Sequence, residues 1–157
     1  MNPYANYLDG RDATDILIAT PSELQALIAG LTIDQMDQPL APGKWSVREV
    51  LAHLADCEIV WAFRMRQAME TPGATVTPFD QDVWATRYSA YSAADALRTF
   101  LALRAWNLSL LTTVSAAERS NPLSHPERGT FPFTELLESI AGHDRNHLLR
   151  LKEQLGR

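Results

Sequence analysis

An apolar stripe with helical spacing near the end of the chain contains two histidines. Leu136, Ile140, His143, His147 and Leu151 follow one another at steps of 4, 3, 4 and 4 residues, which places them on one face of a helix. A buried imidazole without a partner costs about 1–3 kcal/mol, so two of them in an apolar stripe need something to bind. Two histidines one turn apart can both reach one divalent metal at about 2.0–2.1 Å. The stripe therefore predicts a helix that carries part of a metal site.

A third histidine on another predicted helix can complete this site. A second stripe, with steps of 3, 4 and 4 residues, is made by Val50, His53, Cys57 and Trp61. His53 thus lies on or beside a buried helix face. The remaining histidine, His125, precedes a proline in a segment rich in turn residues, where side chains usually face solvent. We therefore predict that His53 joins His143 and His147, and we keep His125 as the weaker alternative.

Length and composition favour one domain without a nucleic-acid or membrane partner. The 157 residues and the hydrophobic content of 46% suffice for one sizeable core, so we expect a single domain over residues 1–157. The net charge is −5 and the 14 basic residues are scattered, which disfavours nucleic acid and anionic membranes. No signal peptide or apolar run of about 18 residues is present, and the single cysteine suits a reducing compartment. We expect a cytoplasmic protein.

The pattern of apolar residues and caps predicts helices joined by loops. The predicted long helices are residues 12–30, 46–69, 92–114 and 134–155. Ser46 with Glu49 forms a capping box at the start of the second helix. Thr20 followed by Pro21 looks like a helix start inside the first region, so we expect that region to be kinked or broken there.

The intervening segments are predicted to contain no strands. Residues 78–88 include a short helical turn within a longer connection, and residues 121–132 form a loop. Alternation of β-branched residues is nearly absent, so strands are not expected. Four long helices with one long central connection predict an all-α four-helix bundle, a fold that often holds metals between its helices.

Two motifs together resemble the DinB/YfiT-like superfamily of metal-binding four-helix bundles. They are Trp45-Ser-Val-Arg-Glu-Val-Leu-Ala-His-Leu-Ala-Asp-Cys-Glu and Ile140-Ala-Gly-His-Asp-Arg-Asn-His-Leu. The likeness extends over nearly the whole chain and includes Asp82-Val-Trp and His125-Pro-Glu-Arg-Gly. The resemblance implies that His53, His143 and His147 bind a divalent metal.

The resemblance also implies a class of function. Members are described as metal-dependent hydrolases, or as transferases and isomerases that use low-molecular-weight thiols, and they are often homodimers. We thus expect a small-molecule substrate, with a thiol as cosubstrate in the transferase case. Histidine ligands do not choose among Zn, Ni, Fe and Mn. No Glu or Asp has a position that identifies it as a general base, and a non-enzymatic metal-binding or stress-associated protein is the alternative.

Residues around the predicted ligands have two interpretations each. Cys57, one turn after His53, is a fourth metal ligand or, as we favour, a small buried apolar residue. Asp56 and Asp144 are acceptors for imidazole N–H groups or surface carboxylates, and Asp56 is the better candidate acceptor. Arg64, eleven residues after His53, meets an anionic substrate group or, as we favour, is a salt-bridge or snorkelling residue. Trp61, Trp84 and Tyr88 line a cavity mouth or, as we favour, belong to the core.

Overall fold

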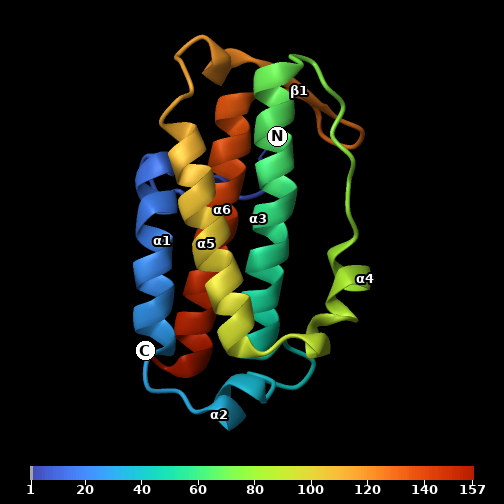
Figure 1. Ribbon diagram of the computed structural model, residues 1–157. Helices are drawn as coiled ribbons and strands as arrows, with labels where there is room; N and C mark the ends of the chain where they lie inside the picture. The colour runs from blue at the N-terminus through green and yellow to red at the C-terminus, as the bar shows by residue number, and fades with distance from the viewer. Residues whose placement is uncertain (1) are drawn as a thin grey trace.

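The computed structural model describes residues 2–157 and contains a bundle of four long helices (Figure 1). These helices are α1 (Ala13–Ile28), α3 (Val47–Glu70), α5 (Ala93–Leu111) and α6 (Phe133–Leu155). The shorter elements are α2 (Ile33–Asp37), α4 (Gln81–Ala85), the 3-10 helices η1 (Ala5–Tyr7), η2 (Tyr88–Ala90) and η3 (Glu118–Ser120), and the strands β1 (Pro122–His125) and β2 (Gly129–Pro132). The predicted all-α four-helix bundle is confirmed.

Side-chain caps begin two of the long helices where the sequence predicts them. Ser46 accepts a hydrogen bond from the backbone N–H of Glu49, and the Glu49 carboxylate accepts one from the N–H of Ser46 at 2.7 Å. Ser92 caps α5 by accepting from the backbone N–H of Asp95. These caps satisfy amide groups that have no partner within the helix, so they fix where α3 and α5 start.

The long central connection follows from the directions of the helices. In Figure 1, α3 and α5 run upward side by side, whereas α1 and α6 run downward. Because α3 has 24 residues, it is about 36 Å long, and a parallel neighbour can begin only after the chain has returned over that length. Residues 71–92, with α4 and η2, make this return.

The expected break near Thr20 is wrong, because α1 continues through Pro21. Proline lacks an N–H group, so the carbonyl of Leu17, four residues earlier, loses its helical donor. The Arg104 guanidinium of α5 donates to that carbonyl at 3.0 Å instead. Thr20 is buried, and its hydroxyl donates to the carbonyl of Ile16 at 2.9 Å rather than capping a new helix. A contact from another helix therefore replaces the lost bond.

The expectation of a plain loop at 121–132 is also wrong, because β1 and β2 form an antiparallel hairpin. Each strand has four residues, and only Leu123 and Phe131, which are paired, point into the core. An alternation this short gives too few apolar positions for a strand signal. Gly129, with φ of +73°, closes the three-residue loop in the left-handed conformation that such hairpins need. The hairpin fixes residues 126–128 at the end of the bundle.

The apolar core is divided into two clusters along the bundle. One cluster contains Cys57, Trp61, Ile140 and Ala141, and the other contains Leu54, Ala55, Leu148 and Leu151. The predicted metal ligands lie where α3 and α6 pass from one cluster to the other. Within residues 2–157, no helix combines the length and the hydropathy of a membrane span.

Candidate metal centre

The three predicted ligands come together between α3 and α6. Nε2 of His53 lies 2.9 Å from Nε2 of His143, and Nε2 of His147 lies 3.2 Å from that same nitrogen. The three ring centroids are 4.5–5.0 Å apart. The one-turn spacing of His143 and His147 places both on the face of α6 that meets His53. Residues 90 positions apart in the chain therefore present their Nε2 atoms to one another.

The spacing of these nitrogens fits a divalent metal. Two imidazole nitrogens bound tetrahedrally at about 2.0–2.1 Å are about 3.3–3.4 Å apart, close to the distances found. A neutral imidazole Nε2 either donates one hydrogen bond or accepts one, so that of His143 cannot pair well with both neighbours. A metal ion satisfies all three lone pairs at once. The two Nε2 separations around His143 are therefore compatible with imidazole ligands to Zn, Ni, Fe or Mn, and the group of ligand atoms that could hold an ion is formed by His53, Cys57 and His143.

Burial keeps these imidazoles neutral. It lowers the pKa of His53 to about 3, with help from the neighbouring His143. The pKa of His143 is also lowered to about 3 by burial and by the Arg104 charge. Burial and the other two histidines hold the pKa of His147 well below its usual value. At neutral pH the rings are therefore uncharged, and each has one ring nitrogen with a free lone pair, as metal ligation requires.

The thiol of Cys57 faces the same point. Its Sγ lies 3.6 Å from Nε2 of His53 and 3.9 Å from Nε2 of His143, and these three ligand atoms form one compact group. A tetrahedral metal with one thiolate and one imidazole separates S and N by about 3.5 Å. Burial raises the pKa of this thiol well above its usual value, so it carries a proton unless a metal displaces it. These distances support a role for Cys57 as a metal ligand, whereas the sequence favoured a small buried apolar residue.

Tyr88 and Asp56 lie on the Nδ1 side of the His53 ring. The Tyr88 hydroxyl lies 3.4 Å from Nδ1 of His53 and is hydrogen-bonded to the Asp56 carboxylate. Binding of a metal through Nε2 leaves the proton on Nδ1, where it can be donated to the Tyr88 oxygen. Asp56 thus acts on the imidazole through Tyr88 rather than directly, and Tyr88 touches the site as well as the core.

Asp144 belongs to a buried charge cluster behind His143. Its Oδ1 lies 3.7 Å from Nδ1 of His143, and both atoms lack a hydrogen-bond partner within the described chain. Its Oδ2 accepts from Arg104 at 2.7 Å, and Arg104 also donates to Glu58 at 2.6 Å. Asn107 donates to the second oxygen of Glu58. Two carboxylates and one guanidinium give this cluster a net charge of −1 beside the metal ligands.

Sequence reasoning missed Glu58, Arg104 and Asn107. The signal was present in the helical stripe Phe100, Arg104, Asn107 and Leu111, whose four members are all buried. The Arg104 pKa is raised: burial opposes its charge, but Asp144 and Glu58 outweigh that effect. A charged residue within an apolar stripe is the same kind of signal that identified the histidines.

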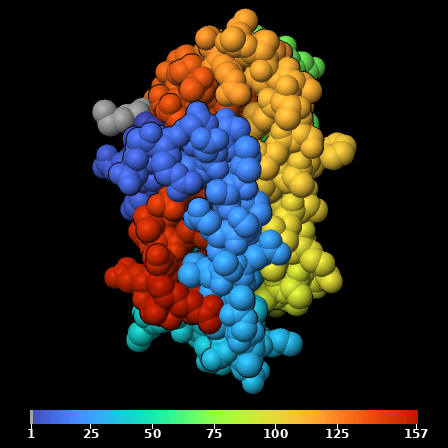
Figure 2. Space-filling model, turned by 90° about the vertical axis from the view of Figure 1, so that its left-hand side faces the viewer, coloured from blue at the N-terminus to red at the C-terminus, as the bar shows by residue number. Residues whose placement is uncertain are grey.

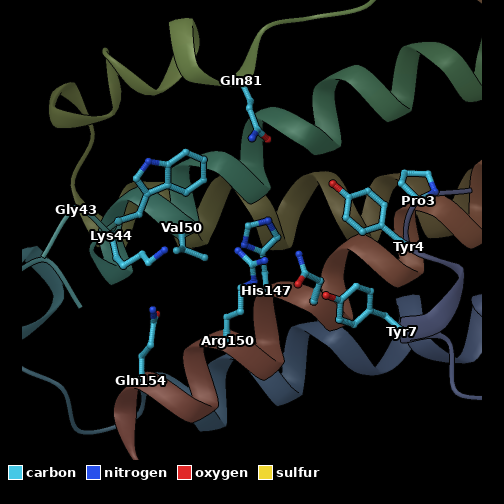
Figure 3. Close-up of a pocket in the computed structure, with 12 residues that line it drawn as sticks. Pro3, Tyr4, Tyr7, Gly43, Lys44, Val50, Gln81, His147, Arg150 and Gln154 are labelled. Atoms are coloured by element: carbon cyan, nitrogen blue, oxygen red, sulfur yellow. The ribbon is translucent and has the colours of Figure 1, made fainter. Parts of the chain in front are cut away.

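Two cavities flank the histidines. An outer cleft of about 430 Å³ surrounds His147, and Figure 3 shows Lys44, Gln81 and Arg150 directed toward it. An inner chamber of about 180 Å³ is bounded by His53, Cys57, Trp61, His143, Arg64 and Arg128, among others. Among residues 2–157, no carboxylate lines either cavity. The predicted metal position therefore lies between two hollows with polar and cationic walls.

The first residues of the chain close one side of the site. The Tyr4 ring packs edge-on against His143, with 5.4 Å between centroids, and Tyr4 borders both cavities. A side chain at Gly142 would place its Cβ 2.4 Å from the Tyr4 carbonyl oxygen, so glycine allows this approach. Figure 2 shows this segment lying across α6. Sequence reasoning missed Tyr4, although the glycine beside His143 was a signal.

The other candidates separate into two groups. Trp61 contacts the His143 ring at 4.8 Å, and Arg64 lines the inner chamber. His125 lies on the hairpin, outside the histidine group, and Trp84 packs on Phe79 in the connection. The structure therefore places Trp61 and Arg64 at the site and leaves the loop histidine away from it.

Comparisons with known proteins agree with this architecture. A "Putative metal-dependent hydrolase" of Bacillus mycoides is 28% identical over 139 residues, covering 86% of this chain and 80% of that protein. A protein of the same name from Oceanobacillus iheyensis is 27% identical over 132 residues, covering 83% and 77%.

A solved structure shares the fold. It is YfiT from Bacillus subtilis, described as a probable metal-dependent hydrolase with an unusual four-helix bundle topology. It superposes with a TM-score of 0.80 at 21% identity, covering 92% of this chain and 86% of that one. The family model of the DinB superfamily matches residues 16–151, which is most of the sequence. The chain belongs to the DinB superfamily.

Proposed function

We propose that this protein is a divalent-metal-dependent enzyme acting on a small molecule, with His53, His143 and His147 as the metal ligands. The observation that carries the proposal is the convergence of three neutral Nε2 atoms beside two cavities. Three histidines leave a coordination position for a substrate, which distinguishes catalytic from closed structural sites. The names of the relatives from Bacillus mycoides and Oceanobacillus iheyensis support a metal-dependent reaction.

The surrounding residues favour thiol-dependent transfer over hydrolysis. Bound here, the metal would lower the pKa of water for hydrolysis or hold a low-molecular-weight thiol as its thiolate. The cavities offer no carboxylate as general base, whereas Lys44, Arg64 and Arg150 supply positive charge that stabilises a thiolate. Gln81 and Tyr4, which border both cavities, would orient the second substrate. Hydrolysis is the alternative reaction, and it is the one that the relatives' names give.

Two further properties belong to this proposal. A homodimer is expected from the family resemblance, with the two cavities of each protomer serving its own site. A cytoplasmic location is expected because the single cysteine, Cys57, is free and buried. Size-exclusion chromatography with light scattering measures the first expectation, and fractionation of cells measures the second.

A non-enzymatic metal-binding protein is the second candidate function, and Cys57 favours it. With Sγ 3.6 Å from Nε2 of His53, this thiol would close the coordination shell as a fourth ligand from the chain. A metal fully held by the protein stabilises the bundle or senses metal rather than activating a substrate.

Metal analysis of purified variants tests the proposal. His53→Ala, His143→Ala and His147→Ala should each lose stoichiometric metal, whereas His125→Ala should keep it. Cys57→Ser should keep the metal and the thiol-dependent activity if the enzyme proposal holds. Full occupancy in His53→Ala would refute the ligand set, and loss of metal in Cys57→Ser would favour the closed site.

A further inference from the structure

We propose that the inner chamber binds an anionic group of the substrate, a carboxylate or a phosphate, between Arg64 and Arg128. This inference rests on the proposed function, because it assigns one end of the molecule whose other end meets the metal. The chamber is lined by His53, His143 and Cys57 and also by the two guanidiniums.

Arg64 carries a buried positive charge without a carboxylate partner. Its side chain is nearly enclosed, with 9% of the residue exposed, and it forms no ion pair with any carboxylate among residues 2–157. One of its nitrogens donates to the carbonyl of Thr77 at 2.8 Å, which orients the group without neutralising it. An enclosed charge without a counter-ion is costly. A salt bridge, one of the two roles favoured by sequence reasoning, is not among its described contacts.

Arg128 adds a second guanidinium from the hairpin. It lies over the Phe131 ring at 4.9 Å and donates to the Ser139 hydroxyl at 3.1 Å. Glu135 accepts from it at 3.3 Å, so Arg128 has a carboxylate partner, whereas Arg64 has none among its described contacts. Burial and the charge of Arg128 both lower the pKa of Arg64, which shows that the two cations repel one another in the ligand-free protein. An anion between them would relieve that repulsion.

The walls of the inner chamber suit an anion, and Arg64 lies two helical turns from Cys57. The chain has 19 acidic and 14 basic residues, yet the chamber contains no acidic side chain. Arg64 follows Cys57 by seven residues, which is two helical turns and about 10.5 Å along α3. The volume of about 180 Å³ is below that of most sites for drug-sized ligands, so the chamber admits one end of a molecule. A guanidinium can bind a carboxylate or a phosphate through two parallel hydrogen bonds.

Anion binding to the chelator-treated full chain tests this assignment. Without metal, an anion cannot bind to the ion itself, and the arginine variants distinguish the chamber from the outer cleft, which contains Lys44 and Arg150. Trp61 lines the chamber, so tryptophan fluorescence should respond to an anion bound there. Fluorescence and the melting temperature are followed while acetate or inorganic phosphate replaces chloride at constant ionic strength. The variants are Arg64→Gln, Arg128→Gln and the matched control Arg66→Gln, whose side chain donates to Ala62 within α3 and lines neither cavity.

The outcomes separate the anion site from the metal site. We expect saturable binding in the wild type and Arg66→Gln, and affinity weaker by about tenfold or more in Arg64→Gln and Arg128→Gln. Tighter acetate binding identifies a carboxylate, and tighter phosphate binding identifies a phosphate. Arg64→Gln should melt no lower than the wild type without added anion, because an unpaired buried charge is removed. Equal anion responses in all four proteins, or none in the wild type, would overturn the proposal even if the metal analysis succeeds.

Discussion

Nε2 of His53 lies 2.9 Å from Nε2 of His143, although 90 residues separate them in the chain. This contact joins α3 to α6 at the boundary between the two apolar clusters. A metal held there would connect two helices that the core already packs together. It would therefore add stability to a fold whose apolar contacts form without the metal.

Chelation should lower the melting temperature without unfolding the protein. A ligand bound only by the folded state adds about 2.7 kcal/mol at a hundredfold excess over its Kd. For a chain of this size the corresponding shift is about 5–10 °C. Calorimetry before and after chelator treatment measures it, and His143→Ala should show no shift. Complete unfolding on chelation would instead make the metal a structural requirement.

Lowering the pH should reduce the free energy of unfolding of the metal-free protein by more than its carboxylates account for. The folded pKa values of His53 and His143 are about 3, below the ordinary value of about 6.5 in the unfolded chain. The unfolded state therefore binds more protons between those values, so the stability present above pH 6.5 is lost as the pH falls toward 3. Urea unfolding from pH 7 to 5, where most carboxylates remain ionised, isolates the effect. A constant free energy of unfolding over that range would contradict it, and His125→Gln should retain most of the slope.

Gly142→Ala should destabilise the protein, although the same change usually stabilises a helix by about 1 kcal/mol. The added Cβ would lie 2.4 Å from the carbonyl oxygen of Tyr4 and 2.7 Å from its Cβ, so the N-terminal segment must move away. We expect a loss of about 1–3 kcal/mol in denaturant unfolding, as for other overpacked sites. Faster tryptic cleavage at Arg11 would report the displaced segment. A gain in stability would show that Tyr4 is not held against α6.

Arg104→Leu should cost about 3–5 kcal/mol, because Glu58 and Asp144 would remain buried without their cation. The triple change Glu58→Gln, Arg104→Met and Asp144→Asn removes all three charges and should recover most of the stability. Denaturant unfolding of the two variants measures both effects. Equal stabilities would mean that the cluster is not electrostatically coupled.

A matched pair of thiols should distinguish the anion chamber from simple metal–thiol binding. In cobalt-substituted protein, 6-mercaptohexanoate and neutral 6-mercaptohexanol should both change the charge-transfer absorption. Arg64→Gln should weaken only the charged thiol, because the carboxylate reaches the chamber while the sulfur meets the metal. Absorption titrations measure both affinities. Absence of a spectral change with either thiol would favour hydrolysis over thiol-dependent transfer.

The sequence predicts most of the fold because its strongest signals are local. The capping box at Ser46 and the stripe ending at Leu151 specify helix starts and faces within a few residues. The stripe also identified His143 and His147 as a pair, and the structure brings His53 to them. Whether these residues bind metal stays a prediction.

Long-range contacts explain what the sequence does not predict. Pro21 indicates a break, but Arg104, 87 positions from Leu17, supplies the missing hydrogen bond. The hairpin strands are too short for their alternation to be recognised, and their apolar residues are fixed by packing against the bundle end. Which residues pair with a buried charge depends on which helices pack together. The periodicity within one helix does not predict this.

The separation of α3 from α6 along the chain determines when the site can assemble during synthesis. His53 leaves the ribosome long before His143 exists, and at about 5–20 residues per second the delay is roughly 5–20 seconds. During that interval α3 carries only two of the candidate ligands, His53 and Cys57. A metal at the proposed site could therefore be held by both helices only after α6 has been translated.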